Sequence, residues 1–448
     1  MNRFTLANTA IALACLTVLP ATQAMDLAQA YKLALSNDSQ VASALSQLQV
    51  IRARLPQAEA ALKPSVNSSA VLQRQYGQVY YPPPRLDATL QYNSQTYSVN
   101  LTYPVYRLQN VEALEQSKLQ IGVAEAQYAA AAQDLILRVS QAYFDVLSSR
   151  DNINTIQAQK RAITEQLAAA KRNFEVGTAT ITDQQEAQAR FDLAVAQELA
   201  AQNDFEVKRA ALALLVGRSV GDINVLRRGV QLTSPQPTQE SQWTGAARDA
   251  NYSVQQARIS SEVAKREIDR QRYADNVTVD VSGSLVHGRS ATYSQVNTNY
   301  ALSGIGLTIS KPLYTGGLVD ARIREAVAAH EKALSDLETA RRQAELSARQ
   351  AFYGVNSGLA QIRALEAAER SSQLALDSNL LGYQVGVRIN IDVLNAQQQL
   401  FTTRRDLARA RYDTLLNSLR LKTTNGSLRE EDLASINAML VTPEAARN

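Results

Sequence analysis

The chain has 448 residues, and its 46 lysine and arginine residues against 42 acidic residues leave a formal net charge of only +4. Because charges of both signs are interspersed, the sequence contains no basic stripe of the kind that binds nucleic acid, and no nucleic-acid partner is expected. Aromatic residues make up only 6% and glycines number only 18. Alanine, glutamine, leucine and arginine are frequent, which favours long helices over compact α/β domains.

Residues 1–24 have the pattern of a secretory signal peptide. A basic residue near the start precedes an apolar stretch that ends at Leu19, and Ala24 closes the segment at a cleavage-site pattern. The sole cysteine, Cys15, lies inside this segment, so the exported chain is expected to have no disulfide and no cysteine-held metal. A lipoprotein-type cleavage before Cys15 is the alternative, although the three residues that precede it match that signal poorly.

The chain after the signal predicts two helices and then two strands. A short amphipathic helix is expected over Asp26–Asn37, and a second one over Ser39–Lys63 that stops before Pro64. From there to Tyr106 the composition changes to serine, asparagine, glutamine, tyrosine and valine, with apolar and polar residues in alternation around Leu101. This period of two predicts strands with one polar face.

A second strand region with the same alternation runs from Val277 to Tyr314. Both strand regions end in a segment that contains a proline, Pro104 in the first and Pro312 in the second. Proline cannot donate a backbone hydrogen bond, so each should lie at the exit of its strand, where the sheet meets the following helix.

Each strand pair precedes a very long predicted helix, about Val111–Glu175 and about Leu318–Gln384. Helices of this length would span on the order of 100 Å, which is too long for a globular core and normal for a coiled coil. Shorter helices return over residues 180–216 and 391–423, and heptad spacing supports coiled-coil packing. The heptad positions are Leu394, Phe401, Ala408 and Leu415.

The two helix-to-helix reversals are copies of one another. Gly177 corresponds to Gly386 and Asp183 to Asp392, at one constant offset of 209 residues (386 − 177 and 392 − 183). The glycines predict tight turns at the hairpin tips. The sequence therefore predicts an internal duplication, and it divides the chain into five parts. These are the signal peptide (1–24), a first structural repeat (25–216), an irregular connector or equatorial belt (217–245), a second repeat (246–425) and a C-terminal equatorial tail (426–448).

Four strands with one polar and one apolar face cannot stand alone. No apolar run of 18 residues is present, so membrane insertion would require a β-barrel. Four strands are too few to close a barrel, so several chains would have to share one barrel. Two copies of the chain would give eight strands and three copies would give twelve. The residues expected to face a water-filled lumen are Asn100, Thr102, Thr278, Asp280 and Ser282.

These features resemble the TolC family of outer-membrane channel-tunnels. The resemblance covers essentially the whole exported chain, and it is carried by the hairpin tips, the repeated plan and the run GYQVGVRINIDVLNAQQQLFTTRRDLARARYDTLLNSLRLKT. It implies a mainly helical homotrimer with a twelve-strand outer-membrane barrel and a long periplasmic helical tunnel, closed at the hairpin tips. It further implies a passive exit duct for efflux or type I secretion, without a cofactor. Its partners would be outer-membrane lipids, a periplasmic adaptor at the tips and an inner-membrane transporter.

The resemblance also assigns residues to the periplasmic gate. Asp392 matches an acidic ring at the constriction, and Asn395 stands where the best-known member of the family has a second acid. The residues that match the closing network are Thr182 and Asp183 in the first tip and Tyr383 and Arg388 in the second.

From the residues alone, simpler interpretations of the gate remain open. Asp183 and Asp392 would each stabilise the first turn of a helix. Arg388 could be a solvated loop charge, and Tyr383 could serve only in packing. The resemblance favours the ring function for Asp392 and a gating bond for Arg388.

Two other classes of function are the alternatives. A periplasmic coiled-coil adaptor or tether without a pore would also be helical, but it would lack paired amphipathic strands that end in matched prolines. A periplasmic enzyme would need a catalytic constellation, and the sequence suggests none. His287 and His330 have no cysteine, aspartate or glutamate at ligand spacing, so no metal or cofactor site is expected.

Overall fold

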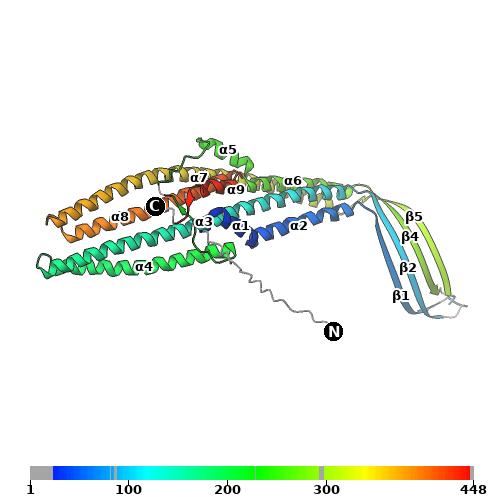
Figure 1. The fold of residues 1–448 in the computed structure, drawn as a ribbon. Helices are drawn as coiled ribbons and strands as arrows, with labels where there is room; N and C mark the ends of the chain where they lie inside the picture. Colours follow the sequence, from blue (N-terminus) through cyan, green and yellow to red (C-terminus); the bar gives the residue numbers. More distant parts are fainter. Residues whose placement is uncertain (1–23, 81, 85–87, 228, 292–296, 444–448) are drawn as a thin grey trace, which may run out of the picture.

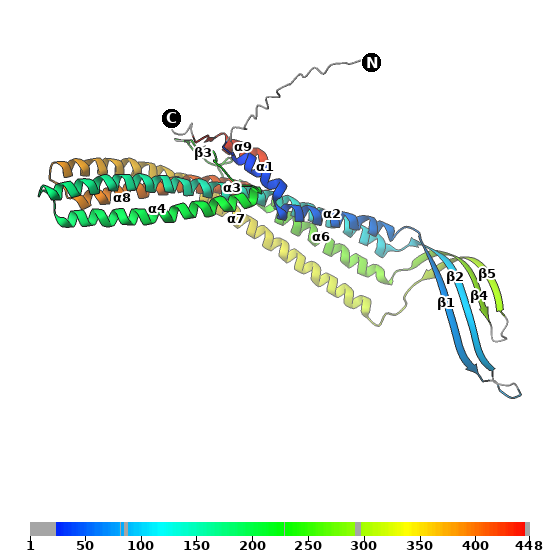
Figure 2. The same cartoon turned by 60° about the horizontal axis from the view of Figure 1, so that its bottom comes forward.

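The computed structural model describes residues 24–80, 82–84, 88–227, 229–291 and 297–443. The signal peptide expected over residues 1–24 therefore lies outside the described residues, apart from Ala24. The molecule is elongated, with a β-sheet at one end, two helical hairpin tips at the other and a group of short elements around the middle (Figures 1 and 2).

The sheet is antiparallel, and it joins the strand pairs of the two halves in the order β1-β2-β4-β5. Its strands are β1 (Ser65–Val79), β2 (Ala88–Tyr106), β4 (Thr278–Ala291) and β5 (Asn297–Ser310). In the register of β2 and β4, Thr102 lies opposite Ser282 and Asn100 opposite Ser284. Residues directly opposite one another point to the same face, and Thr278 and Asp280 share that face because strands alternate with a period of two. The predicted polar face is thereby confirmed.

The other face of the sheet is apolar and exposed in the isolated chain. Val99 lies opposite Leu285, and Val281 lies opposite Leu307 on the same face. Along β5, Ile305 is 90% exposed and Ile309 is 65% exposed. An apolar surface of this extent normally marks a membrane or protein contact.

The helices repeat in the same order in the two halves, as α1, α2, α3, α4 and then α5, α6, α7, α8. In the first half they are α1 (Leu27–Asn37), α2 (Ser39–Ala60), α3 (Leu108–Glu175) and α4 (Ile181–Val216). In the second half they are α5 (Glu240–Ala250), α6 (Tyr252–Arg272), α7 (Leu318–Gln384) and α8 (Asn390–Thr424), and a 3₁₀ turn, η1 (Tyr273–Asp275), follows α6. Both α2 and α4 pack on α3, and both α6 and α8 pack on α7. Among the described residues, none of these helices combines the length and apolar character needed to cross a membrane.

The heptad pattern of α8 supports packing against two neighbours at once. Leu394 packs with Ile163 of α3, whereas Leu400 packs with Leu376 of α7. Leu407 continues the α7 contact further along the helix. The two adjacent stripes of leucines therefore join the second hairpin to itself and to the first hairpin.

A belt of short elements surrounds the middle of the helices. It consists of α1, α5, α9 (Glu430–Asn437), β3 (Val225–Leu226) and β6 (Leu440–Val441). The two short strands pair with each other, although they come from the connector and from the tail. Beneath the belt the phenol of Tyr143 is fully buried and donates to the backbone oxygens of Met25 (3.0 Å) and Asn224 (2.9 Å).

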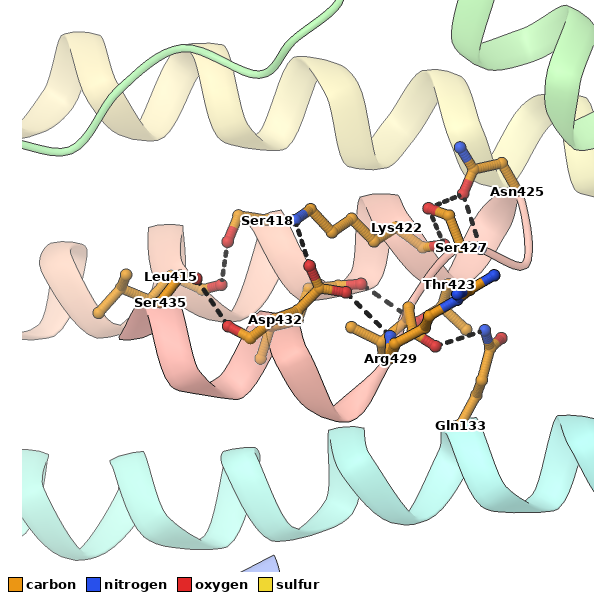
Figure 3. A network of polar contacts seen from close by, with 12 residues as sticks. Gln133, Leu415, Ser418, Lys422, Thr423, Asn425, Ser427, Arg429, Asp432 and Ser435 are labelled. Carbon is orange, nitrogen blue, oxygen red and sulfur yellow. Dashed lines mark hydrogen bonds and ion pairs between the residues drawn. The ribbon is translucent and has the colours of Figure 1, made fainter. Parts of the chain in front are cut away.

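Polar contacts hold α9 against α3 and α8 (Figure 3). The ammonium of Lys422 lies 2.6 Å from the carboxylate of Asp432. The amide of Gln133 on α3 donates to the backbone oxygen of Leu428 at 2.9 Å. The described part of the tail, residues 426–443, thus contributes to the belt.

The connector or equatorial region was expected to end at residue 245. Helix α5 begins at Glu240, so the proposed boundary falls inside it. Gly245 obscured the helix in the sequence. Helix α5 is stabilised by the buried Trp243, which packs with Phe352 and donates to the backbone oxygen of Pro237 at 2.7 Å.

Candidate periplasmic gate

The two hairpin tips have the same backbone turn. In the first tip the N–H of Thr178 donates to the oxygen of Asn173, and in the second the N–H of Val387 donates to the oxygen of Gly382, each at 2.8 Å. Gly177 and Gly386 occupy the left-handed position of these turns with φ of 78° and 77°. A residue with a Cβ would be strained there, which explains the glycine in both copies.

The carboxylate of Asp183 makes its hydrogen bonds within its own hairpin. Its carboxylate accepts from the backbone N–H (2.9 Å) and the hydroxyl (2.7 Å) of Thr180, and its own N–H donates back to that hydroxyl. This reciprocal capping begins α4. Thr182 is exposed beside it. The simpler interpretation of Asp183 as a helix-capping acid therefore accounts for its contacts within one chain.

Tyr383 and Arg388 do not contact Thr182 or Asp183 within one chain. The phenol oxygen of Tyr383 accepts from the amide of Asn173 at 3.2 Å, which joins the ends of α7 and α3. The guanidinium of Arg388 lies 3.6 Å from the carboxylate of Asp392, one turn further along its own hairpin. A bond from Arg388 to the first tip would therefore have to join two copies of the chain.

The centre of the contact between the hairpins is Asn390, which the sequence analysis did not single out. It is only 1% exposed. Its amide oxygen accepts from Gln166 of α3, and its amide nitrogen donates to the backbone oxygen of Asp183 at 3.2 Å. A polar residue between the β-branched Ile389 and Ile391 was the signal in the sequence that could have identified it.

A second polar contact between the hairpins involves Asn395. The guanidinium of Arg190 on α4 donates to its amide oxygen at 3.1 Å. Asp392, three residues earlier, has a side chain that is 34% exposed. The two positions proposed for the constriction thus differ in surroundings, because Asp392 faces Arg388 and Asn395 faces Arg190.

The junction between sheet and helices contains a charge pair that the sequence analysis also missed. Pro104 lies where the register of β2 shifts against β4, opposite Asp280. Arg107, which directly precedes α3, binds both carboxylate oxygens of Asp280 at 2.8 and 2.6 Å. Pro312 lies between the end of β5 and the start of α7. Both prolines therefore lie at transitions from sheet to helix.

No group of three or more histidine, cysteine, aspartate or glutamate side chains suited to a metal ion occurs among the described residues. The contacts at the tips are hydrogen bonds between the hairpins and an ion pair within the second one, and they are suited to holding two hairpins together or releasing them.

Comparison with known proteins agrees with this architecture. The family model for the outer membrane efflux protein matches residues 30–218 and 243–427. The chain is 31% identical to the outer membrane protein TolC of Vibrio cholerae over 428 residues, which covers 95% of this chain and 96% of that protein. It is 29% identical to the alkaline protease secretion protein AprF of Pseudomonas aeruginosa, with 94% and 88% covered. The crystal structure of the outer membrane protein VceC from Vibrio cholerae has the same fold, with a TM-score of 0.77 at 20% identity over 89% of this chain and 96% of that one.

Proposed function

The chain belongs to the outer membrane efflux protein family and forms an outer-membrane exit duct for efflux or type I secretion, and we propose that it does so as a homotrimer gated at its hairpin tips. In this proposal the sheet lies in the outer membrane and the helices extend into the periplasm. A periplasmic adaptor binds at the tips, and an inner-membrane transporter delivers the substrate.

The unpaired outer edges of the sheet are the observation that supports a trimer. Among the described residues, β1 pairs only with β2 and β5 only with β4, so both outer edges keep free backbone groups. Free edges are unfavourable in water and still more so in lipid. Three copies would pair these edges into one closed barrel of twelve strands. The exposed apolar face around Ile305 and Ile309 would then contact lipid, and the polar face around Asn100 would line the lumen.

The hairpin tips support the position of the gate. They lie at the end of the molecule farthest from the sheet (Figure 1). The contacts around Asn390, Tyr383 and Asn395 are hydrogen bonds between polar side chains, which neighbouring waters can replace when the hairpins separate. Such contacts suit a closure that opens on docking of partners better than a packed apolar core does.

The test has two parts. Native mass spectrometry of the protein in detergent should show a trimer, and the same trimer should produce discrete conductance steps in a planar lipid bilayer. A tether without a pore would give trimers or other oligomers that never conduct. A stable folded monomer would contradict the shared barrel.

A further inference from the structure

A cavity of about 520 Å³ lies under the belt, between α3, α8 and the strand β3. We call it the arginine pocket, after the four arginines in its lining. The charged residues that line it are Arg150, Asp151, Arg161, Arg227 and Arg411. Four positive charges therefore face one negative charge in a hollow formed by a single chain.

Most of this positive charge is not neutralised by the protein. Neither Arg161 nor Arg227 has an ion-pair partner among the described residues. Arg150 has a long contact of 3.9 Å with Asp222 and donates to the backbone oxygen of Ile223 at 3.5 Å. The guanidinium of Arg411 uses one nitrogen for Glu366 at 2.8 Å.

A buried donor of Arg411 is also unsatisfied. Its Nε is buried and has no hydrogen-bond partner among the described residues. A buried donor left without a partner is unfavourable by about 1–3 kcal/mol, and more for a charged group. The guanidinium of Arg411 is therefore only partly hydrogen-bonded by the described residues.

The one acid of the pocket does not balance the charge of its four arginines. The carboxylate of Asp151 accepts from the phenol of Tyr412 at 2.6 Å. Burial raises the pKa of Asp151, although Tyr412 and the arginines Arg150 and Arg411 act in the opposite direction. Its negative charge is therefore held less firmly than that of an exposed aspartate, and it leaves the arginines in excess.

The position of the pocket excludes a lipid headgroup as its occupant. Arg150 lies 42 residues along α3 from the start of that helix at Leu108. At 1.5 Å per residue this places the pocket on the order of 60 Å from the sheet. The occupant must therefore come from the aqueous space around the helices.

We propose that the arginine pocket binds a small multivalent anion that carries phosphate or several carboxylates. Guanidinium groups bind such anions with paired, charge-assisted hydrogen bonds, and four arginines line this cavity. The volume of the cavity is within the range of small-molecule sites. An acidic segment of a partner protein would instead need a groove open along its length, whereas this hollow is bounded by α3, α8 and β3. This binding function is independent of conduction.

The test is isothermal titration calorimetry on the full-length protein in detergent, with inorganic pyrophosphate and with citrate as probes, at low and at high salt. The wild type should give saturable binding to at least one probe, weaker at high salt. The variant Arg161→Gln/Arg227→Gln should weaken it about tenfold or more, because it removes two free guanidinium groups whose loss breaks no ion pair of the fold.

The matched control is Arg54→Gln/Arg218→Gln, which removes the same charge from two exposed arginines outside the pocket. It should bind like the wild type. Absence of saturable binding in the wild type, or equal affinities of the two double variants, would overturn the proposal. Binding of a polyglutamate peptide without binding of either small anion would also overturn it, in favour of a protein partner.

Discussion

Asn390 makes two hydrogen bonds between the hairpins from a position that water does not reach. Truncation to alanine would leave the amide of Gln166 and the backbone oxygen of Asp183 without these partners. Each unsatisfied group is unfavourable by about 1–3 kcal/mol, so the variant should hold the tips together less firmly.

We therefore predict that Asn390→Ala increases the single-channel conductance of trimers in planar bilayers. The matched control is Asn203→Ala, which truncates an exposed asparagine of α4 and should leave conductance unchanged. Native mass spectrometry should show intact trimers for both variants. If the two variants conduct alike, Asn390 has only a packing function.

Tyr383 and Arg388 allow a comparison between two types of gate. Within one chain, Tyr383→Phe removes a neutral hydrogen bond worth about 1 kcal/mol. Arg388→Ser removes an exposed ion pair worth about 0–1 kcal/mol. If these were their only contacts, the double variant should raise conductance less than Asn390→Ala does.

The family resemblance predicts a further bond from these two residues to Thr182 and Asp183 of a neighbouring copy. In that case the double variant should raise conductance more than Asn390→Ala. The measured order of the two conductances therefore decides whether the gate includes bonds between copies. Unchanged conductance with intact trimers would make Tyr383 and Arg388 ordinary surface residues.

At the scale of elements, Asp38 joins α1, α2 and α3. Its carboxylate accepts from the N–H of Val41 at 2.8 Å and so caps α2. It also binds the guanidinium of Arg138 on α3 at 2.7 Å, with a side chain only 5% exposed. The hydrogen bond from Arg138 is the largest cause that lowers the pKa of Asp38 below its usual value. The stabilisation is therefore present above the ordinary pKa of the carboxyl and is lost as the pH falls through the lowered one.

We predict that Asp38→Asn destabilises the protein at neutral pH by about 2 kcal/mol, because asparagine keeps the helix cap but loses the charge. The difference from the wild type should shrink as the pH falls below the ordinary pKa of the carboxyl and through the lowered one, where the wild-type carboxyl becomes protonated. Thermal melting at several pH values measures both effects. The control is Asp134→Asn, which removes the exposed partner of the same arginine and should have an effect below about 1 kcal/mol.

The elements differ in how far the sequence predicted them. The long helices and the strands have a clear periodicity, and their observed ends lie close to the predicted ones. The helix α9 has only eight residues, and β3 and β6 have two each, which is too short for a period to show. Their stability comes from partners distant in the chain or across a turn, such as the Lys422–Asp432 pair that holds α9.

The same limit applies to the site. The glycine turns and the acids Asp183 and Asp392 were predictable because local backbone chemistry and the internal repeat identify them. The partner of Asn390 was not, since Gln166 lies 224 residues away in the sequence. The neighbours of Asp392 and Asn395 were likewise visible only after folding.

For the whole molecule, threefold symmetry would turn each residue near the axis into a ring of three. Asp392 would then form a ring of three carboxylates, whereas a relative with a second acid has six. Like charges held in a narrow channel attract multivalent cations, more strongly as their number rises. We therefore expect a trivalent complex added on the periplasmic side to block this channel more weakly than a relative with two acidic rings.

The structure also indicates which substitutions should strengthen block of the channel by a trivalent cation. Arg190 lies 3.1 Å from the amide oxygen of Asn395, so a new carboxylate at that position would form an ion pair with it. We predict that Asn395→Asp alone strengthens block only slightly, whereas Asn395→Asp with Arg190→Gln strengthens it about tenfold, the factor that corresponds to about 1.4 kcal/mol. Asp392→Asn should remove most of the block. The measurement is the bilayer current at low and high salt, since screening should weaken the effect of every ring. Block that persists in Asp392→Asn would place the constriction elsewhere in the tunnel.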